Sequence, residues 1–238
     1  MITRRLDVLA AGFDAVPRRA AGKTGAMQLT SVEDLRGIYR PPAGAPIDKV
    51  IHRLDAHCVD FIAKAPFFVL STANADGVCD GSPKGGSPGF VQVLDDKRLA
   101  WADFSGNNRL DSFQNLVAND SVALLFLIPG LDETLRVNGR AELVVDPELR
   151  DRFAVGGRPA RVVVVVTVDE AYIHCAKALR RAGLWSSETW LDRAELPSAA
   201  CIVKDHAEID VDVAVIEEYR ERDLETTLWK PGGDGARE

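Results

Sequence analysis

The chain has 238 residues, of which 46% are hydrophobic and 27% are charged, and its 36 acidic and 29 basic residues give a net charge of −7. This composition is ordinary for a globular protein, and it excludes a collagen-like or wholly disordered chain. The acidic balance disfavours a nucleic-acid-binding protein. A membrane-spanning helix needs roughly 20 apolar residues, and the longest apolar runs, 122–129 and 162–168, are far shorter.

Four cysteines are spread widely along the chain and form no CxxC pair; they are Cys58, Cys79, Cys175 and Cys201. A secreted disulfide scaffold is denser in cysteine, and a structural zinc site needs closely spaced ligands. We therefore expect reduced thiols in a cytoplasmic protein, and no metal site. Residues 1–26 carry several basic residues without the apolar core of a signal peptide, which predicts a flexible N-terminal extension.

Helices are predicted between residues 27 and 65. Ser31 followed by Asp34 fits a capping box, in which the serine caps a backbone N–H and the acid caps another in return. The short helix that follows ends before Pro41. Apolar residues then recur at helical spacing from Ile47 to Ile62, which predicts one continuous second helix.

From residue 66 the apolar period changes from that of a helix to that of a strand. The β-rich runs are 67–72, 78–83, 90–94, 98–102, 122–128, 134–143 and 161–167. Most of them follow one another through short polar turns, which is typical of an antiparallel sheet. One helix interrupts them, with Asn107 or Asn108 as its cap. Its predicted buried stripe consists of Leu110, Phe113, Leu116 and Val117.

These segments predict a mainly β fold with flanking helices, built on a split or closed barrel of about six antiparallel strands over residues 66–180. A further helical stretch runs from Asp146 to Phe153. Residues 181–238 are interpreted as a helical tail packed on the barrel, with a charged surface helix from Val213 to Leu228.

The segment 81–90 ends a predicted strand and is rich in glycine. Ser82 offers a hydroxyl group and Lys84 a positive charge, and the glycines let backbone N–H groups approach a ligand closely. By itself, this pattern fits a polar hairpin loop equally well. A second feature is needed before it indicates a binding site.

The segment Ser105–Arg109 provides a second feature at the start of a helix. Unpaired N–H groups and the helix dipole favour an anion there, and the Arg109 guanidinium suits a phosphate. The alternative is a capped helix with an exposed arginine. Asp103 and Asp111 oppose the binding of an anion, so this segment alone does not decide between the two interpretations.

Arg136 and Arg140 on the polar face of a later strand extend the basic set, and the segments together predict a phosphorylated ligand. Trp101 and Phe104 either wall a flat ring or pack in the core. The adjacent pair His174-Cys175 is interpreted as structural, because neighbours on a strand point to opposite faces. No residue stands out as an obligatory catalytic acid or base.

Several motifs carry a resemblance to a known family; they are Asp55–Cys58, Ser82–Gly85, Pro88–Val91, Gly106–Ser112, Leu125–Pro129, Glu133–Ala141 and His174–Ala178. In combination they resemble the pyridoxamine 5'-phosphate oxidase-like, FMN-binding split-barrel proteins, and most closely an uncharacterised bacterial subgroup. The resemblance extends from about residue 28 to the C-terminus and fits the order of strands given above.

The resemblance implies a six-stranded split barrel that forms a homodimer, with one FMN in each of two clefts at the subunit interface. The cofactor-binding residues that it implies are Ser82, Lys84, Trp101, Asn108, Arg109, Thr134, Arg136 and Lys177. In this arrangement Asn108 and Arg109 hold the phosphate, and Thr134 and Arg136 approach the ring. Lys177 reaches the cofactor from the partner chain.

The oxidases of this family end in an Arg-x-His element that grips the substrate, and its absence from this sequence disfavours oxidation of pyridoxamine 5'-phosphate. The resulting prediction is an FMN-dependent oxidoreductase, in which a nicotinamide reduces the flavin and an unknown small molecule or oxygen accepts the electrons. The alternatives are a non-catalytic flavin-binding or redox-sensing protein, and a split barrel that uses a deazaflavin or haem, for which His174 is the candidate ligand.

Overall fold

The computed structural model describes residues 28–233, so the predicted extension over 1–26 lies outside the described residues. The chain divides into two units, residues 1–43 and 44–238. In the first unit, α1 (Val32–Ile38) begins with the predicted capping box. The Asp34 N–H donates to Ser31 Oγ at 3.0 Å, and the Ser31 N–H donates to the Asp34 carboxylate at 3.1 Å. The capping box is therefore confirmed.

The prediction of one continuous helix over 47–62 is wrong. The structure has two short helices instead, α2 (Ala45–Asp48) and α3 (Ala56–Lys64). Between them Ile51 bridges to Ala171 of the sheet: the Ile51 N–H donates at 3.0 Å and the Ile51 C=O accepts at 2.7 Å. This tertiary backbone pairing interrupts the helix, and apolar spacing alone does not reveal it.

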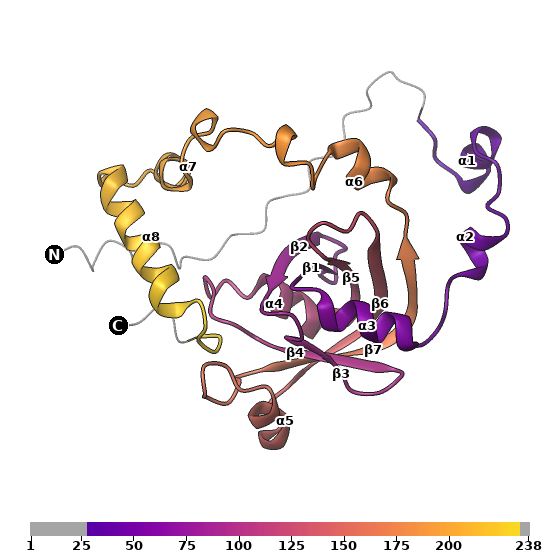
Figure 1. Cartoon of the computed structure of the whole chain (residues 1–238), viewed down its shortest axis with the longest axis horizontal. Coiled ribbons are helices and arrows are strands. Elements are labelled where there is room, and N and C mark those ends of the chain that lie inside the picture. The colour runs from indigo at the N-terminus through magenta and orange to yellow at the C-terminus, as the bar shows by residue number, and fades with distance from the viewer. Residues whose placement is uncertain (1–27, 234–238) are drawn as a thin grey trace. The chain divides into compact units, whose positions relative to one another are not determined.

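Seven strands form one antiparallel sheet in the second unit (Figure 1). They are β1 (Phe67–Ala73), β2 (Cys79–Gly85), β3 (Val91–Val93), β4 (Arg98–Ala102), β5 (Ser121–Leu127), β6 (Thr134–Val144) and β7 (Val163–His174). Their order is β2-β1-β5-β6-β7-β4-β3, and all neighbouring pairs are antiparallel. The predicted split-barrel fold with flanking helices is confirmed. The sheet has seven strands where about six were expected, and its edge strands β2 and β3 do not pair with each other.

After α3 the helices are α4 (Asp111–Ala118), α5 (Pro147–Arg152), α6 (Lys177–Ala182), α7 (Ala199–His206) and α8 (Val213–Thr227). Two 3₁₀ turns, Ser187–Thr189 and Arg193–Glu195, connect α6 to α7. The predicted surface helix is confirmed by α8, which buries none of its residues. Among the described helices, none is both long and apolar enough to cross a membrane.

The predicted buried stripe on α4 is only partly right. Leu116 is buried and Phe113 is half-buried, but Leu110 and Val117 are 50% and 82% exposed. The reason is geometric, since α4 begins at Asp111, after Leu110, and Val117 lies about 100° around the helix from Leu116.

The core lies between the inner face of the sheet and the helices α3 and α4, which contact β3 and β1 respectively (Figure 1). Phe68 is fully buried, and its ring contacts those of Trp101 and Phe126 with centroids 5.0 Å apart in each case. Leu135 and Val137 of β6 are both buried in this core. The packing holds the end of β4 and the start of α4 beside the edge strand β2.

Candidate functional site

The loop that joins β4 to α4 has an unusual backbone. Asn108 and Leu110 have φ values of 56° and 58°, a left-handed conformation that costs a non-glycine residue on the order of 1–3 kcal/mol. Asn107 Oδ1 accepts from the Arg109 N–H at 3.1 Å, and the Gln114 side chain donates to the Arg109 carbonyl at 2.9 Å. These contacts hold the backbone of Arg109 in place at the start of α4.

The start of α4 has no side-chain cap, so the prediction of Asn107 or Asn108 as the cap is wrong. Left-handed residues on both sides of Arg109 delay the helix until Asp111, and the cap position falls to Leu110. The backbone N–H groups of the first turn therefore have no side-chain acceptor from the cap. An uncapped helix start of this kind is favourable for a negatively charged group.

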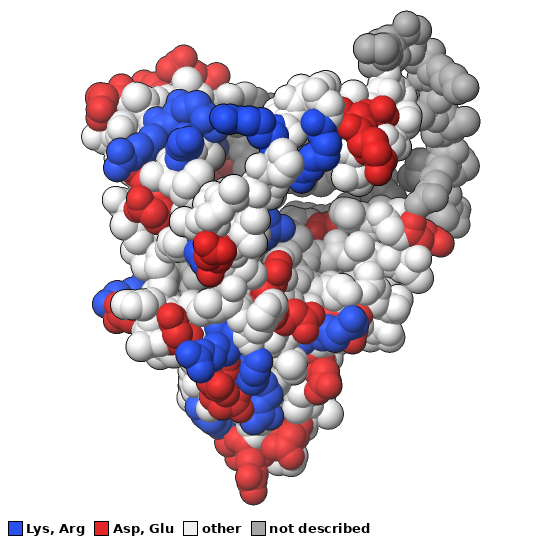
Figure 2. Space-filling model, turned by 90° about the vertical axis from the view of Figure 1, so that its right-hand side faces the viewer, with Lys and Arg blue, Asp and Glu red and all other residues white. Residues whose placement is uncertain are grey.

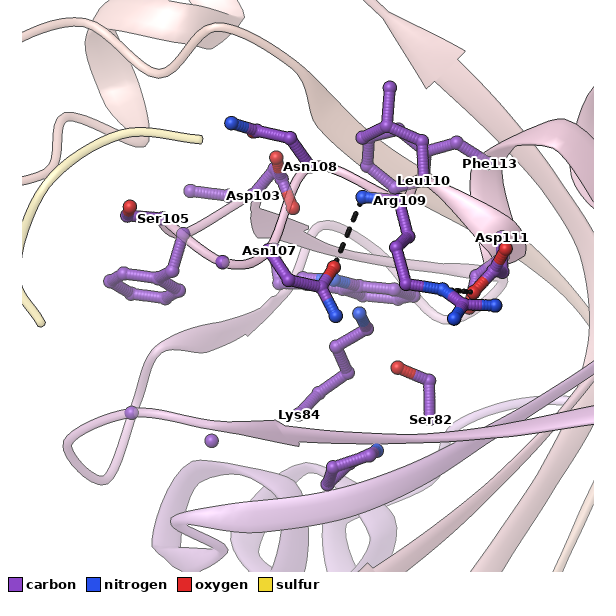
Figure 3. A pocket seen from close by; sticks show the side chains of 18 of the residues that line it. Ser82, Lys84, Asp103, Ser105, Asn107, Asn108, Arg109, Leu110, Asp111 and Phe113 are labelled. Carbon is purple, nitrogen blue, oxygen red and sulfur yellow. Dashed lines mark hydrogen bonds and ion pairs between the residues drawn. The ribbon is translucent and has the colours of Figure 1, made fainter. Parts of the chain in front are cut away.

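The loop and the edge strand β2 enclose a cavity of about 690 Å³ (Figure 3). Its wall consists of residues 80–86 and Phe90, residues 101–110, the first turn of α4, and Leu228, Trp229 and Gly233 near the C-terminus. Small-molecule sites commonly have volumes of about 300–1,000 Å³. The cavity is thus large enough for a cofactor.

Two basic and three acidic side chains line the cavity. Lys84 points from β2 toward the loop (Figure 3) and forms no ion pair with any residue of 28–233. Arg109 Nε donates to Asp111 Oδ2 at 2.8 Å, which raises the pKa of Arg109. Asp80 accepts from the Ser112 hydroxyl at 3.0 Å. Two of the five charges are therefore already paired, and Lys84 is available to a ligand.

Asp103 follows β4 and is half-buried in the cavity wall. Burial raises the pKa of its carboxyl group to about 6, and the positive charge of Lys84 opposes this rise. The carboxylate packs so closely on Gly232 that a Cβ atom there would stand 1.8 Å from Asp103 Oδ2. A carboxyl group that titrates near neutrality in a cavity is a candidate functional group. Sequence reasoning weighed Asp103 only as a charge that opposes an anion.

Aromatic side chains form another part of the wall. Trp101 is 2% exposed, belongs to the core and also lines the cavity. Phe104 lies between Phe90 and Trp229, with ring centroids 6.3 Å and 6.1 Å away. The two interpretations that the sequence left open for Trp101 and Phe104 are therefore compatible, since a ring can pack on the core and face a cavity at once.

A segment near the C-terminus pairs with the β4–α4 loop. The Ser105 N–H donates to the Lys230 carbonyl at 2.9 Å, and the Gly232 N–H donates to the Asp103 carbonyl at 3.0 Å. This pairing brings Trp229 to the cavity. Sequence reasoning missed this contact because the pairing segments are far apart along the chain. The available signal was the turn-forming Pro-Gly-Gly run after α8.

The structure brings five of the eight predicted cofactor-binding residues together around the cavity; they are Ser82, Lys84, Trp101, Asn108 and Arg109. The other three do not line it. Thr134 is buried in β6, and Arg136 on the same strand lies over the Tyr172 ring, 5.9 Å from its centroid. Lys177 is exposed in the first turn of α6.

Basic side chains also gather outside the cavity. Figure 2 shows a band of Lys and Arg across the upper part of one face, with acidic and basic side chains mixed below it. Helix α6 carries three basic residues among its six, Lys177, Arg180 and Arg181. Within residues 28–233, no three His, Cys, Asp or Glu side chains are grouped so as to hold a metal ion.

Comparison with solved structures finds distant neighbours. HupZ from Group A Streptococcus is 18% identical with a TM-score of 0.41, and the alignment covers 50% of this chain and 92% of that one. General stress protein 26 from Bacillus anthracis is 17% identical with a TM-score of 0.37, covering 48% and 89%. An FMN-binding protein from Syntrophomonas wolfei is 14% identical with a TM-score of 0.37, covering 49% and 87%. A search of curated proteins finds no match.

Comparison with protein families is more informative. A family model described as pyridoxamine 5'-phosphate oxidase matches residues 54–175, just over half of the chain. The matched range contains all seven described strands and both segments that the sequence singles out for ligand binding. The chain therefore belongs to the pyridoxamine 5'-phosphate oxidase-like, FMN-binding split-barrel family.

Proposed function

We propose that the protein is an FMN-dependent oxidoreductase that acts on a small molecule. The observation that carries this proposal is the 690 Å³ cavity, which combines two basic side chains, an uncapped helix start and an aromatic wall. FMN joins a phosphate to a flat ring system, so this set of groups fits it. Family membership supports a flavin as the class of ligand.

In this proposal the phosphate of FMN binds at the start of α4. The Arg109 guanidinium suits two phosphate oxygens, Lys84 adds a second positive charge, and N–H groups of the first turn complete the site. Arg109 must exchange Asp111 for the phosphate, and both side chains are about half-exposed, which makes their ion pair weak. A charged hydrogen bond contributes about 1.5–3 kcal/mol, so each basic side chain should matter measurably.

The flat ring binds against Trp101 and Phe104, and Ser82 and Asn108 offer polar groups to the rest of the cofactor. Bound FMN supplies the transfer of electrons between a donor and an acceptor. The residues of the chain bind the cofactor, orient it and exclude water from the aromatic side of the cavity. The carboxyl group of Asp103, with its pKa raised to about 6, can take up a proton in the same cavity below about pH 6.

We propose a nicotinamide as the electron donor, and a small organic molecule or oxygen as the acceptor. The 238 residues contain no Arg-x-His element, which argues against pyridoxamine 5'-phosphate as the substrate. No histidine lines the described wall of the cavity, so FMN is favoured over haem. The four cysteines are free thiols, which supports the proposal of a reducing, cytoplasmic location.

We further propose that the protein is a homodimer with the cofactor at the subunit interface. The basis is a set of three residues that the family resemblance places at the cofactor but that do not line the cavity of their own chain; they are Thr134, Arg136 and Lys177. A second copy that supplies these residues reconciles the two observations.

The test is to mix the purified full chain with FMN, desalt it and record the absorption spectrum. We expect retained flavin peaks, and their loss in the Lys84→Ala plus Arg109→Ala variant. Arg98→Ala is the matched control, because Arg98 pairs with Asp95 at 2.7 Å with similar exposure but lines no part of the cavity. Equal retention by all three proteins would overturn the assignment of the site, and a chain that never retains FMN would overturn the cofactor.

Anaerobic addition of NADH or NADPH then separates an enzyme from a flavin carrier. Bleaching of the flavin, followed by recovery with an acceptor in repeated turnovers, is expected for the proposed oxidoreductase. A flavin that neither nucleotide reduces points to the non-catalytic alternative. The spectrum of the chromophore that co-purifies with the protein distinguishes FMN from a deazaflavin or haem.

A further inference from the structure

A second cavity, of about 320 Å³, lies next to the first. Its wall is built from loop 87–90, Gln92 of β3, Ala102 at the end of β4, Phe104 in the following loop, residues 152–156 at and after the end of α5, and Trp229. None of the eight predicted cofactor-binding residues lines it. Its volume is at the lower end of the range for small-molecule sites, which suits a ligand of one or two rings.

The two cavities share an aromatic wall. Phe90, Phe104 and Trp229 line both of them. The backbone of Trp229 packs closely on Gly156, since a Cβ atom on Gly156 would stand only 2.6 Å from the Trp229 carbonyl oxygen. With φ at 57°, Gly156 also has a backbone that favours glycine. The wall between the cavities is therefore a built feature of the fold.

The second cavity has a single charge. Among the described residues that line it, Arg152 is the one charged side chain. Arg152 Nε donates to Gln92 Oε1 at 3.0 Å, and its guanidinium carbon lies 5.8 Å from the centroid of the Phe153 ring. No acidic side chain of residues 28–233 pairs with it. Gln92 thus orients the guanidinium without neutralising it.

We propose that this second cavity binds a planar aromatic carboxylate. Arg152 pairs with the carboxylate through its fork of N–H donors, and the ring of the ligand packs among Phe104, Phe153 and Trp229. Four aromatic side chains with one unneutralised cation select a ligand that combines a flat ring with a negative charge. This site goes beyond the proposed FMN site and does not depend on it, because its cation lines only the second cavity.

The test is a ligand-observed NMR titration of the full chain with benzoate, without added FMN, and with benzamide as the uncharged analogue of the same shape. We expect saturable benzoate binding and at least about tenfold weaker binding of benzamide. In Arg152→Met, benzoate affinity should fall by about tenfold or more. Arg152 is exposed, so this variant should fold normally.

Arg98→Met is the matched control, since Arg98 is also exposed and pairs with Asp95 outside both cavities. A second variant, Trp229→Ala, should weaken benzoate by about threefold to tenfold through loss of ring contact. Absence of saturable benzoate binding, equal binding of benzamide, or unchanged affinity in Arg152→Met would each overturn the proposal. Arg152→Met should retain FMN as the parent protein does, which separates failure of this proposal from failure of the FMN site.

Discussion

Asp103, in the wall of the first cavity, makes the stability of the protein depend on pH. Burial raises the pKa of its carboxyl group from 3.8 to about 6. Below pH 3.8 the group is protonated in both the folded and the unfolded chain. The contribution of Asp103 to the free energy of unfolding is then fully present. As the pH rises through about 6, the folded state must ionise a buried carboxyl group, so this stability is lost.

The replacement Asp103→Asn should remove this pH dependence. A shift of about two pKa units corresponds to roughly 3 kcal/mol. We therefore compare the free energy of unfolding of Asp103→Asn with that of the parent protein at two pH values. The difference, variant minus parent, should be up to about 3 kcal/mol larger at pH 7.5 than at pH 3.5. Urea unfolding of both proteins at the two pH values measures it. A difference between them that is the same at both pH values would contradict the role of burial.

At the scale of the element, the bulge where β6 passes β7 depends on one glycine. The register between the two strands shifts at Asn138 and Gly139. A Cβ atom on Gly139 would stand 2.1 Å from the Thr167 carbonyl oxygen, a backbone atom that cannot move alone. The alternating pattern of β6 predicts which residues face the core, but it does not show this close approach.

The replacement Gly139→Ala should therefore separate the two strands locally and destabilise the protein by about 2–3 kcal/mol. Thermal unfolding measures the effect as a lower Tm. Gly81→Ala is the control within the same sheet, because no atom lies within 4 Å of a Cβ at that position on the edge strand. We expect it to change stability by less than about 0.5 kcal/mol. Equal shifts in the two variants would show that the clash at β6 is relieved without cost.

At the scale of the whole molecule, the proposed homodimer makes FMN binding depend on assembly. Light scattering after gel filtration should give twice the mass of one chain. Arg136→Ala and Lys177→Ala should lower FMN retention although neither residue lines the cavity of its own chain. Arg98→Ala serves as the control on an exposed strand arginine. A monomer, or full retention in both variants, would show that the described cavity binds FMN without a second copy.

Local sequence patterns were enough to predict the strands, the antiparallel class and the two segments that meet at the cavity. Strand periodicity and turn residues are local properties, so 67–72 and 134–143 can be recognised without the rest of the chain. The glycine-rich run after Lys84 and the polar run before Arg109 were likewise visible in the sequence. Their motifs also carried the family resemblance, which the match over 54–175 confirmed.

How these parts meet became visible only in the folded chain. The tertiary structure broke the second helix at Ile51, because a backbone pair with the sheet replaced helical hydrogen bonds there. It brought Trp229 to the cavity through backbone pairs that no local pattern encodes. It also buried Asp103, whose pKa depends on which atoms exclude water from it. Such contacts join residues far apart in the chain, and they exist only once the sheet has formed.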